Sequence, residues 1–208
     1  MLWVLWFEMV FSYYGIFTWL PQILAATNGY DLGRSFGAVL LITLAQVPGY
    51  FSAAYLVERW GRKPTLVTYL LGSAAAALLM GLRGLGAEAS GAELILWGSL
   101  VSFFNLGAWG VVDGYTPELY PTYARGSGAG WVAGIGRIGG IAGPLLVGVM
   151  LGPLGAGAVF GMFAAVLLVI ALDVLFLGEE TTGLTLEEIS GARTHPNAGA
   201  TATVANRG

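Results

Sequence analysis

Residues 127–177 read SGAGWVAGIGRIGGIAGPLLVGVMLGPLGAGAVFGMFAAVLLVIALDVLFL, and this stretch decides the fold class. It is almost continuously apolar on both sides of a Gly152-Pro153-Leu154 turn. A helix needs about 20 apolar residues to cross the ~30 Å hydrocarbon core of a bilayer, because it rises 1.5 Å per residue. The stretch is therefore long enough for two membrane-crossing helices joined by a short turn.

Four further apolar segments of similar length precede this pair. The six predicted crossings are approximately Leu2–Ala26, Phe36–Val57, Pro64–Leu82, Leu94–Tyr115, Ser127–Leu151 and Gly155–Leu177. The connectors between them are short, which makes consecutive helices antiparallel neighbours. We therefore expect an all-α, polytopic membrane bundle over residues 1–178. Residues 179–208 are expected to form a polar tail that is largely disordered after about residue 190.

Composition supports a membrane protein and excludes several functional classes. Apolar residues make up 56% of the chain and charged residues 10%, whereas soluble domains carry about 25% charged residues. The chain has no cysteine, so disulfides and thiolate metal sites are excluded. Nine Lys and Arg residues are too few and too scattered for a nucleic-acid surface. No metal-binding, phosphate-loop or nucleophile–base pattern is present, so we expect neither an enzyme nor a cofactor.

The positions of Lys and Arg predict the orientation of the bundle. Basic residues in short loops are retained on the cytoplasmic side. Six fall on one side of a six-helix bundle, namely Arg59, Arg62, Lys63, Arg125, Arg193 and Arg207. Only Arg34 and Arg83 fall on the other side, so both termini are predicted to be cytoplasmic in an inner or plasma membrane. His195 lies in the tail, away from other metal-ligating residues, and is expected to be a solvated side chain.

Three connectors on the predicted cytoplasmic face carry motifs. Residues 58–64 read ERWGRKP, residues 117–126 read PELYPTYARG, and residues 178–189 read GEETTGLTLEEI. Together, in this order and at these helix intervals, they resemble the major facilitator superfamily, in particular its sugar-porter-like and organic-acid or aromatic-acid symporter branches. One position departs from the pattern, since Glu179 stands where that family usually has Pro.

The resemblance implies a role for the whole chain. It maps the six helices to helices seven to twelve of a twelve-helix transporter, that is, to one half built from 3+3 inverted repeats. Such a half forms one wall of a site for a small organic solute, either a sugar or an organic or aromatic acid. We therefore expect alternating-access transport in the lipid bilayer, by proton symport or facilitated diffusion. The partner would be an N-terminal six-helix half or a second copy, and Met1 entering a helix directly favours a truncated chain.

Charged residues in the motif connectors are predicted to form a gating cluster. Its members are Glu58, Arg59, Arg62, Glu118, Arg125 and Glu180. Ion pairs among them, with Glu118 and Arg125 as the pair to test, would tie helix ends together and stabilise one conformational state. The alternative is that these charges only set topology and solubility.

Polar and aromatic side chains inside the predicted helices are candidates for substrate contact, because ionisable groups are costly in lipid. The predicted substrate-facing residues are Glu8, Ser12, Tyr13, Tyr14, Gln46, Tyr50, Asn105, Trp109, Asp113 and Arg137. They fall on helical stripes such as Asn105-Trp109-Asp113. The aromatic residues could equally serve helix packing or an interfacial belt, and Asp113 is close enough to the cytoplasmic boundary to reach water.

Arg137 lies about 18 Å into the membrane, counted from Arg125 at the helical rise. Gly126, Gly130 and Gly134 precede it at the four-residue spacing that lets helix backbones approach closely. Arg137 is therefore expected to be buried against protein or a cavity rather than lipid, where its guanidinium could hold the carboxylate of an anionic substrate. It could instead pair with Glu8 or with an acid in the other half. The alternatives to a transporter are a non-transporting receptor or assembly subunit and an inactive fragment.

Overall fold

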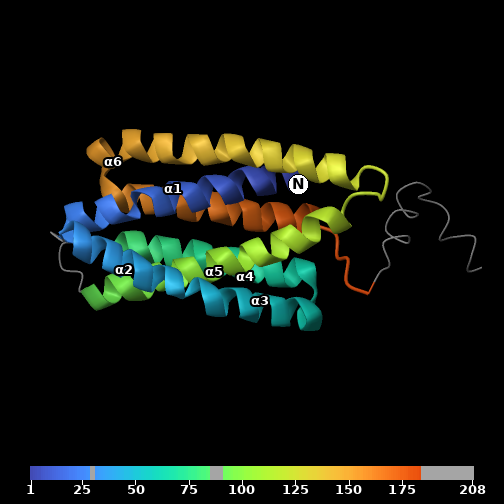
Figure 1. Cartoon of the computed structure of the whole chain (residues 1–208), viewed down its shortest axis with the longest axis horizontal. Coiled ribbons are helices and arrows are strands. Elements are labelled where there is room, and N and C mark those ends of the chain that lie inside the picture. Colours follow the sequence, from blue (N-terminus) through green and yellow to red (C-terminus); the bar gives the residue numbers. More distant parts are fainter. Residues whose placement is uncertain (29–30, 85–90, 184–208) are drawn as a thin grey trace, which may run out of the picture.

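The computed structural model describes residues 1–28, 31–84 and 91–183, and all regular structure in this part is helical (Figure 1). The helices run side by side along one long axis. They are α1 (Leu2–Asn28), α2 (Leu32–Leu44), α3 (Gln46–Trp60), α4 (Arg62–Leu79), the π-helical turn η1 (Met80–Gly84), α5 (Gly91–Glu118) and α6 (Arg125–Leu177). The predicted all-α class is confirmed.

Four helical segments of the described chain are long and apolar enough to cross a membrane. They are Gly33–Trp60, Arg62–Arg83, Ala92–Glu118 and Arg125–Leu177. Helix α1 is 27 residues long but is not among them. All six predicted segments lie in helices, and their assignment as six separate crossings stays a prediction.

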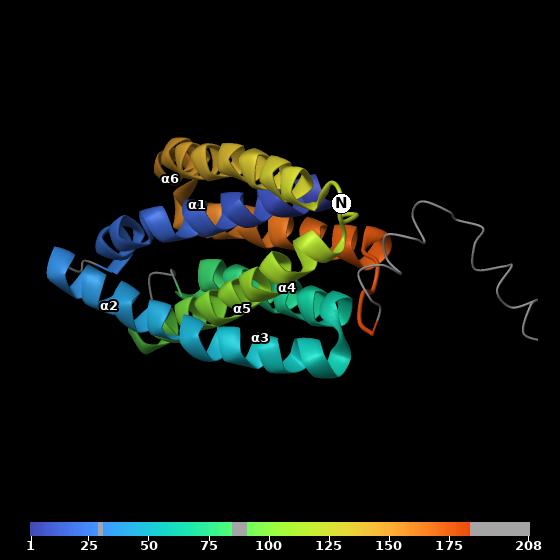
Figure 2. The same ribbon diagram turned by 45° about the vertical axis from the view of Figure 1, so that its right-hand side comes forward.

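Helix α6 contains two of the predicted segments and reverses between them. Its 53 residues would extend about 80 Å if straight, well beyond the thickness of a bilayer. At Gly155 the backbone has φ 75° and ψ 169°, a conformation in which only glycine avoids a steric penalty. The limbs on either side of Gly155 run antiparallel, and α1 lies between them (Figures 1 and 2).

The predicted helix Phe36–Val57 is interrupted rather than continuous. Ala45 separates α2 from α3, and its N–H bonds to the Ile42 carbonyl at 3.3 Å in a tightened turn. The cause lies three residues later, because Pro48 has no N–H to pair with the carbonyl of Leu44. At the start of α2, Asp31 caps the helix by accepting a 2.7 Å hydrogen bond from the Arg34 N–H.

Close packing between α1 and the first limb of α6 depends on small residues. A Cβ atom at Gly139 would meet the Phe7 carbonyl, and one at Gly143 would meet the Phe11 carbonyl. The glycine series that was predicted to pack against a neighbouring helix has no such neighbour in the described structure. A Cβ atom at Gly126, Gly130 or Gly134 would meet no atom of another segment within 4 Å. The backbone of α6 thus approaches α1 through a second glycine series that is offset along the helix.

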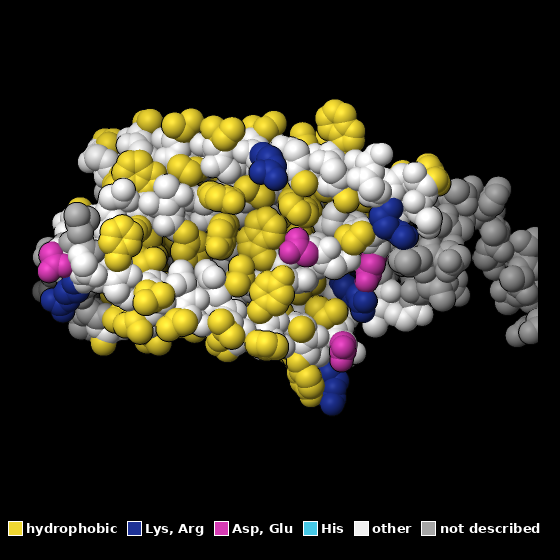
Figure 3. All heavy atoms as spheres, viewed as in Figure 1, with side chains coloured by type: hydrophobic (Ala, Val, Ile, Leu, Met, Phe, Trp, Pro, Cys, Tyr) yellow, Lys and Arg dark blue, Asp and Glu magenta, His cyan; other side chains and the backbone are white. Residues whose placement is uncertain are grey.

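On the face shown in Figure 3, apolar side chains lie along the length of the bundle, and the Lys, Arg, Asp and Glu side chains gather mainly toward its two ends. The α2–α3 segment is the least enclosed candidate span, with 17% of its apolar window buried. This distribution suits a bundle surrounded by lipid. The tail beyond Gly183, including His195, Arg193 and Arg207, lies outside the described residues.

Candidate functional site

An aromatic cavity of about 440 Å³ opens between α1, α5 and the first limb of α6. Arg137 is its charged lining residue, and its side chain is exposed on this face. The lining consists of Trp6, Val10, Tyr14, Trp109, Ala133, Arg137, Gly140 and Ile141. Three predicted substrate-facing residues, Tyr14, Trp109 and Arg137, therefore share one cavity although they come from three different helical segments.

The indole rings of this aromatic cavity hold one another in place. Trp6 and Trp109 meet edge to face with ring centroids 5.5 Å apart, and the Trp6 indole N–H donates a 2.8 Å hydrogen bond to the Thr116 hydroxyl. Tyr13 also meets the Trp109 ring edge to face, at 6.2 Å. Edge-to-face contacts fix ring orientation, so the cavity has a stiff aromatic wall.

Buried polar atoms without partners in the described structure also occur on α5 and α1. The amide of Asn105 is 1% exposed, and neither its oxygen nor its nitrogen has a hydrogen-bond partner in the described structure. The same holds for the Trp109 indole N–H and one carboxylate oxygen of Glu8. Such atoms normally pair with protein, water or ligand, because leaving them unpaired costs about 1–3 kcal/mol each. Ser12 differs, since its buried hydroxyl donates to the Met9 carbonyl at 3.1 Å.

The predicted substrate-facing residues Gln46, Tyr50 and Asp113 lie outside the lining of the aromatic cavity. Tyr50 lines a smaller cavity of about 120 Å³ together with Arg62, Gly110 and Glu118. Asp113 is exposed and lies within electrostatic range of Tyr50. Gln46 is half-buried, and its amide nitrogen has no partner among the described residues. These side chains therefore follow the α3–α5 boundary and are absent from the lining of the aromatic cavity.

Three connectors meet at one end of the bundle in a cluster that we call the latch, made of Arg62, Glu118, Glu180 and Thr181. Arg62 at the start of α4 forms an ion pair with Glu118 at the end of α5, with Nη2 and Oε1 2.9 Å apart. Arg62 Nε lies 3.3 and 3.1 Å from the two oxygens of the same carboxylate. The Thr181 hydroxyl donates a 2.5 Å hydrogen bond to Glu118, so the segment after α6 joins the pair.

Glu180 of the latch supplies the N-terminal cap that α4 lacks in its own sequence. The residue before α4 is Gly61, which has φ 100° and no side chain to cap the helix. Glu180 accepts hydrogen bonds from the backbone N–H groups of Arg62 at 3.0 Å and Lys63 at 3.1 Å. A Cβ at Gly61 would collide with this carboxylate at 2.7 Å. The chain beyond α6 therefore completes a helix more than one hundred residues earlier.

Hydrogen bonds favour the charged form of Glu180. Partial burial acts to raise its pKa, but hydrogen bonds from the Thr182 hydroxyl and from the backbone N–H groups of Arg62, Thr182 and Lys63 outweigh burial. The pKa of Glu180 is consequently below its ordinary value. The carboxylate stays ionised at neutral pH, next to the positive end of the α4 dipole.

The other members of the predicted gating cluster do not join the latch ion pair. Arg125, the expected partner of Glu118, instead donates from Nε to the Pro117 carbonyl at 2.9 Å. Arg59 places its guanidinium over the Tyr55 ring, 5.1 Å from the centroid, and Glu58 is exposed. The partner of Glu118 is therefore Arg62.

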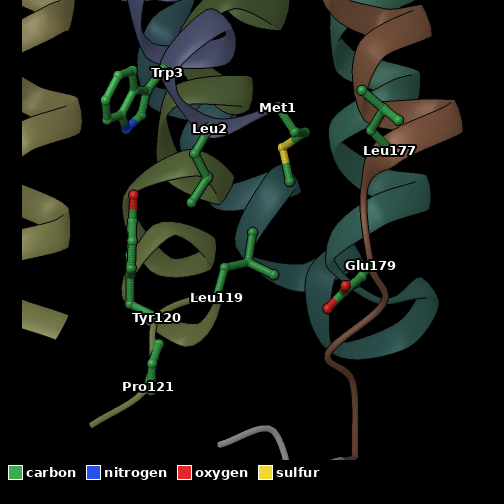
Figure 4. A pocket seen from close by; sticks show the side chains of 8 residues that line it. All are labelled: Met1, Leu2, Trp3, Leu119, Tyr120, Pro121, Leu177 and Glu179. Carbon is green, nitrogen blue, oxygen red and sulfur yellow. The ribbon is translucent and has the colours of Figure 1, made fainter. Parts of the chain in front are cut away.

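A third cavity, of about 630 Å³, lies at the same end of the bundle (Figure 4). Its walls come from the start of α1, the segment after α5 and the end of α6. The lining residues are Met1, Leu2, Trp3, Leu119, Tyr120, Pro121, Leu177 and Glu179. Its lining is mainly apolar, with the Glu179 side chain at one margin, so it lacks the concentrated charge of the neighbouring latch.

A family model described as "Sugar (and other) transporter" matches residues 1–192, nearly the whole chain. The chain belongs to this sugar transporter family. The family is part of the major facilitator superfamily, so the resemblance inferred from the three connector motifs is confirmed. This sugar transporter family chain is therefore a multi-pass membrane protein.

Individual relatives are substantially longer than this sugar transporter family chain. It is 51% identical over 190 residues to the niacin transporter NiaP of Acinetobacter baylyi, covering 91% of this chain and 42% of that protein. It is 48% identical over 189 residues to the putative niacin/nicotinamide transporter NiaP of Bacillus subtilis, covering 90% and 46%. An auto-inhibited POT family peptide transporter has the same fold, with a TM-score of 0.70 at 17% identity, over 85% of this chain and 36% of that one. The chain thus spans less than half the length of these proteins.

Several residues of the aromatic cavity and of the region around the latch were not predicted from the sequence of this sugar transporter family chain. Trp6 lies seven residues before Tyr13, on the same helical face, and that spacing was the available signal. Thr181 and Tyr115 gave no comparable signal. Thr181 joins Glu118, and the buried Tyr115 hydroxyl donates to the Glu179 carbonyl, which fixes the segment after α6 against α5.

Proposed function

We propose that this chain forms the C-terminal half of an alternating-access transporter for a small aromatic acid of the niacin class. The observation that carries the proposal is the aromatic cavity, in which Arg137 stands beside Trp6, Trp109 and Tyr14. Niacin is a pyridine ring with one carboxylate. A guanidinium can hold that carboxylate through two parallel hydrogen bonds, while indole and phenol rings cover the faces of the heterocycle.

The position of Arg137 supports a substrate-facing role. An exposed arginine deep in a membrane-crossing helix is costly unless it faces protein or a polar cavity. Open space in front of Gly126, Gly130 and Gly134 adjoins it on the same limb, where another helix can approach closely. We assign this face to the remainder of a full-length transporter, which would supply the opposite wall of the site.

We add to the proposed site buried polar groups that have no partner in the described structure. The amide of Asn105 can both donate to and accept from a substrate or a bound water. Glu8 and Asp113 are the acidic side chains within the helices that we assign to proton handling, in keeping with symport. Gln46 and Tyr50, at the α3–α5 boundary, would then contact substrate in a different conformation from the one in this structure.

The latch is the proposed conformational control. Arg62, Glu118, Thr181 and the Glu180 cap connect α4, α5 and the chain after α6 at the end that we assign to the cytoplasm. These contacts form and break without covalent chemistry, so they can favour one of two states until substrate binding shifts the balance. Each surface pair contributes about 1 kcal/mol or less, and coupling within the latch increases the total.

Uptake of labelled nicotinate tests the proposal. The chain would be expressed in cells that lack niacin uptake, together with the unmatched remainder of the Acinetobacter baylyi transporter. We expect uptake only when both parts are present, and a loss of about tenfold or more for Arg137→Gln, since hydrogen bonds to charged groups contribute about 1.5–3 kcal/mol. Arg137→Lys, which keeps the charge without the bidentate geometry, should transport poorly.

The matched control is Arg83→Gln, which removes a basic side chain from η1 and should leave uptake unchanged. Normal uptake by Arg137→Lys would refute bidentate binding of the carboxylate. A non-transporting receptor would show nicotinate binding without uptake in either combination. That outcome would replace the transport proposal.

A further inference from the structure

The outer face of the α2–α3 segment ends in an arginine that has no acidic partner among the described residues. Side chains on this face follow one another at intervals of three or four residues and are all exposed. They are Phe36, Leu40, Leu44, Val47, Phe51, Tyr55 and Arg59. We call this series the outer stripe. It continues across the interruption at Ala45, so a single exposed and mainly apolar surface extends along the whole segment.

The length of the outer stripe matches the hydrocarbon core of a bilayer. Phe36 and Tyr55 are 19 positions apart, which corresponds to about 28 Å at the helical rise, close to the ~30 Å of the core. Phe51 is 75% exposed and Tyr55 57%, so neither is covered by another part of the described chain. Tyr55 thus stands at the edge of the acyl chains, and Arg59 lies one turn beyond, at the level of the headgroups.

The side chain of Arg59 folds back along α3 toward Tyr55. Its guanidinium lies over the Tyr55 ring, 5.1 Å from the ring centroid, and this is a cation–π contact. Stacking covers one face of the guanidinium and leaves the N–H groups at its edge available. Trp60, 56% exposed, stands beside it with the amphipathic side chain that is typical of membrane–water interfaces.

The neighbouring charges leave Arg59 available to an external anion. Arg62 is paired with Glu118, and Glu180 caps α4. Lys63 adds a second positive charge, whereas the exposed Glu58 is the adjacent acid and makes no ion pair with Arg59 in the described chain. A phosphate diester fits the edge of a stacked guanidinium, because it accepts two parallel hydrogen bonds.

We propose that the outer stripe with Arg59, Tyr55 and Trp60 binds an anionic phospholipid, with its acyl chains along the stripe and its phosphate on Arg59. A lipid is favoured over a soluble anion because the guanidinium is the end of a bilayer-length apolar surface. The site is separate from the aromatic cavity and does not depend on the transported substrate.

Native mass spectrometry of the purified chain in detergent tests this site. The chain is mixed with equal amounts of phosphatidylglycerol and phosphatidylcholine that carry identical acyl chains, and the retained lipids are counted. We expect preferential retention of phosphatidylglycerol. Arg59→Gln should reduce it about fivefold, since one basic residue near an anionic surface contributes about 1 kcal/mol. Tyr55→Leu, which keeps the charge and the apolar surface, should reduce it about twofold.

Arg34→Gln is the matched control, because it removes the same charge at the opposite end of the same segment and should change nothing. Circular dichroism checks the helical content of each variant, and Arg59→Lys replaces Arg59→Gln if the latter does not fold. Equal retention of both lipids, an equal loss in Arg34→Gln, or no loss in the Arg59 and Tyr55 variants would overturn the proposal. Displacement of the lipid by an equal concentration of glycerol phosphate would show a site for free anions instead.

Discussion

The Arg62–Glu118 pair of the latch can be measured separately from its surroundings by a double-mutant cycle. Arg62→Gln and Glu118→Gln remove the two charges while keeping polar side chains of similar size. The pair is about one-quarter exposed, with side-chain exposures of 29% and 22%. Coulomb attraction at ~4 Å and an effective dielectric constant of about 20 amounts to about 4 kcal/mol, before desolvation and side-chain ordering reduce it. We expect a net coupling energy of about 1–2 kcal/mol.

Unfolding of the purified chain in a denaturing-detergent titration provides the measurement, followed by tryptophan fluorescence. The discriminating control is the same cycle with Arg125→Gln in place of Arg62→Gln. Arg125 is bonded to the Pro117 carbonyl, so its coupling to Glu118 should be below about 0.5 kcal/mol. A larger coupling with Arg125 than with Arg62 would refute the pairing, and negligible coupling in both cycles would show that the Arg62–Glu118 pair contributes no stability.

Two further predictions follow from the latch and from the helix packing. Glu180→Gln should lower the stability of the chain by about 1 kcal/mol at neutral pH, as loss of a helix cap does. Because the folded pKa of Glu180 is lowered, the difference between the wild type and Glu180→Gln should be full above the carboxyl's ordinary pKa of 4.5 and should shrink as pH falls below it. A pH-independent difference would argue against an ionised cap. Gly139→Leu should separate α1 from α6 and lower the thermal unfolding midpoint far more than Gly130→Leu, which faces open space. Equal shifts for the two variants, measured by fluorescence, would contradict the packing.

Helix positions were predictable because a bilayer imposes a minimum length on apolar segments. The interruption at Ala45 was not, since Leu44 and Val47 continue the apolar pattern across it and only Pro48 signals the missing hydrogen bond. The two glycine series of α6 illustrate a similar limit. Gly126, Gly130 and Gly134 have the more regular spacing, yet α1 packs against Gly139 and Gly143, because the choice depends on which face the neighbouring helix covers.

The sequence indicated many of the residues that form the candidate sites, but it did not indicate which of them contact one another. Connector motifs placed Arg62, Glu118 and Arg125 near one another, but sequence spacing could not tell which guanidinium faces the carboxylate. Tyr14, Trp109 and Arg137, which line the aromatic cavity, were among the predicted substrate-facing residues, but the sequence did not predict that they share one cavity, and Trp6 resembled any other aromatic residue of a membrane helix. Its contribution depends on an edge-to-face contact with Trp109, between residues more than one hundred positions apart.

The location of α1 between the two limbs of α6 also bears on the biosynthesis of the protein. Helix α1 is synthesised before both limbs of α6, so its glycine-lined partner does not yet exist while α2 to α5 are inserted. The contacts of α1 with both limbs of α6 are complete only after residue 177 has been synthesised, and a chain that ended before residue 125 would leave this face of α1 exposed.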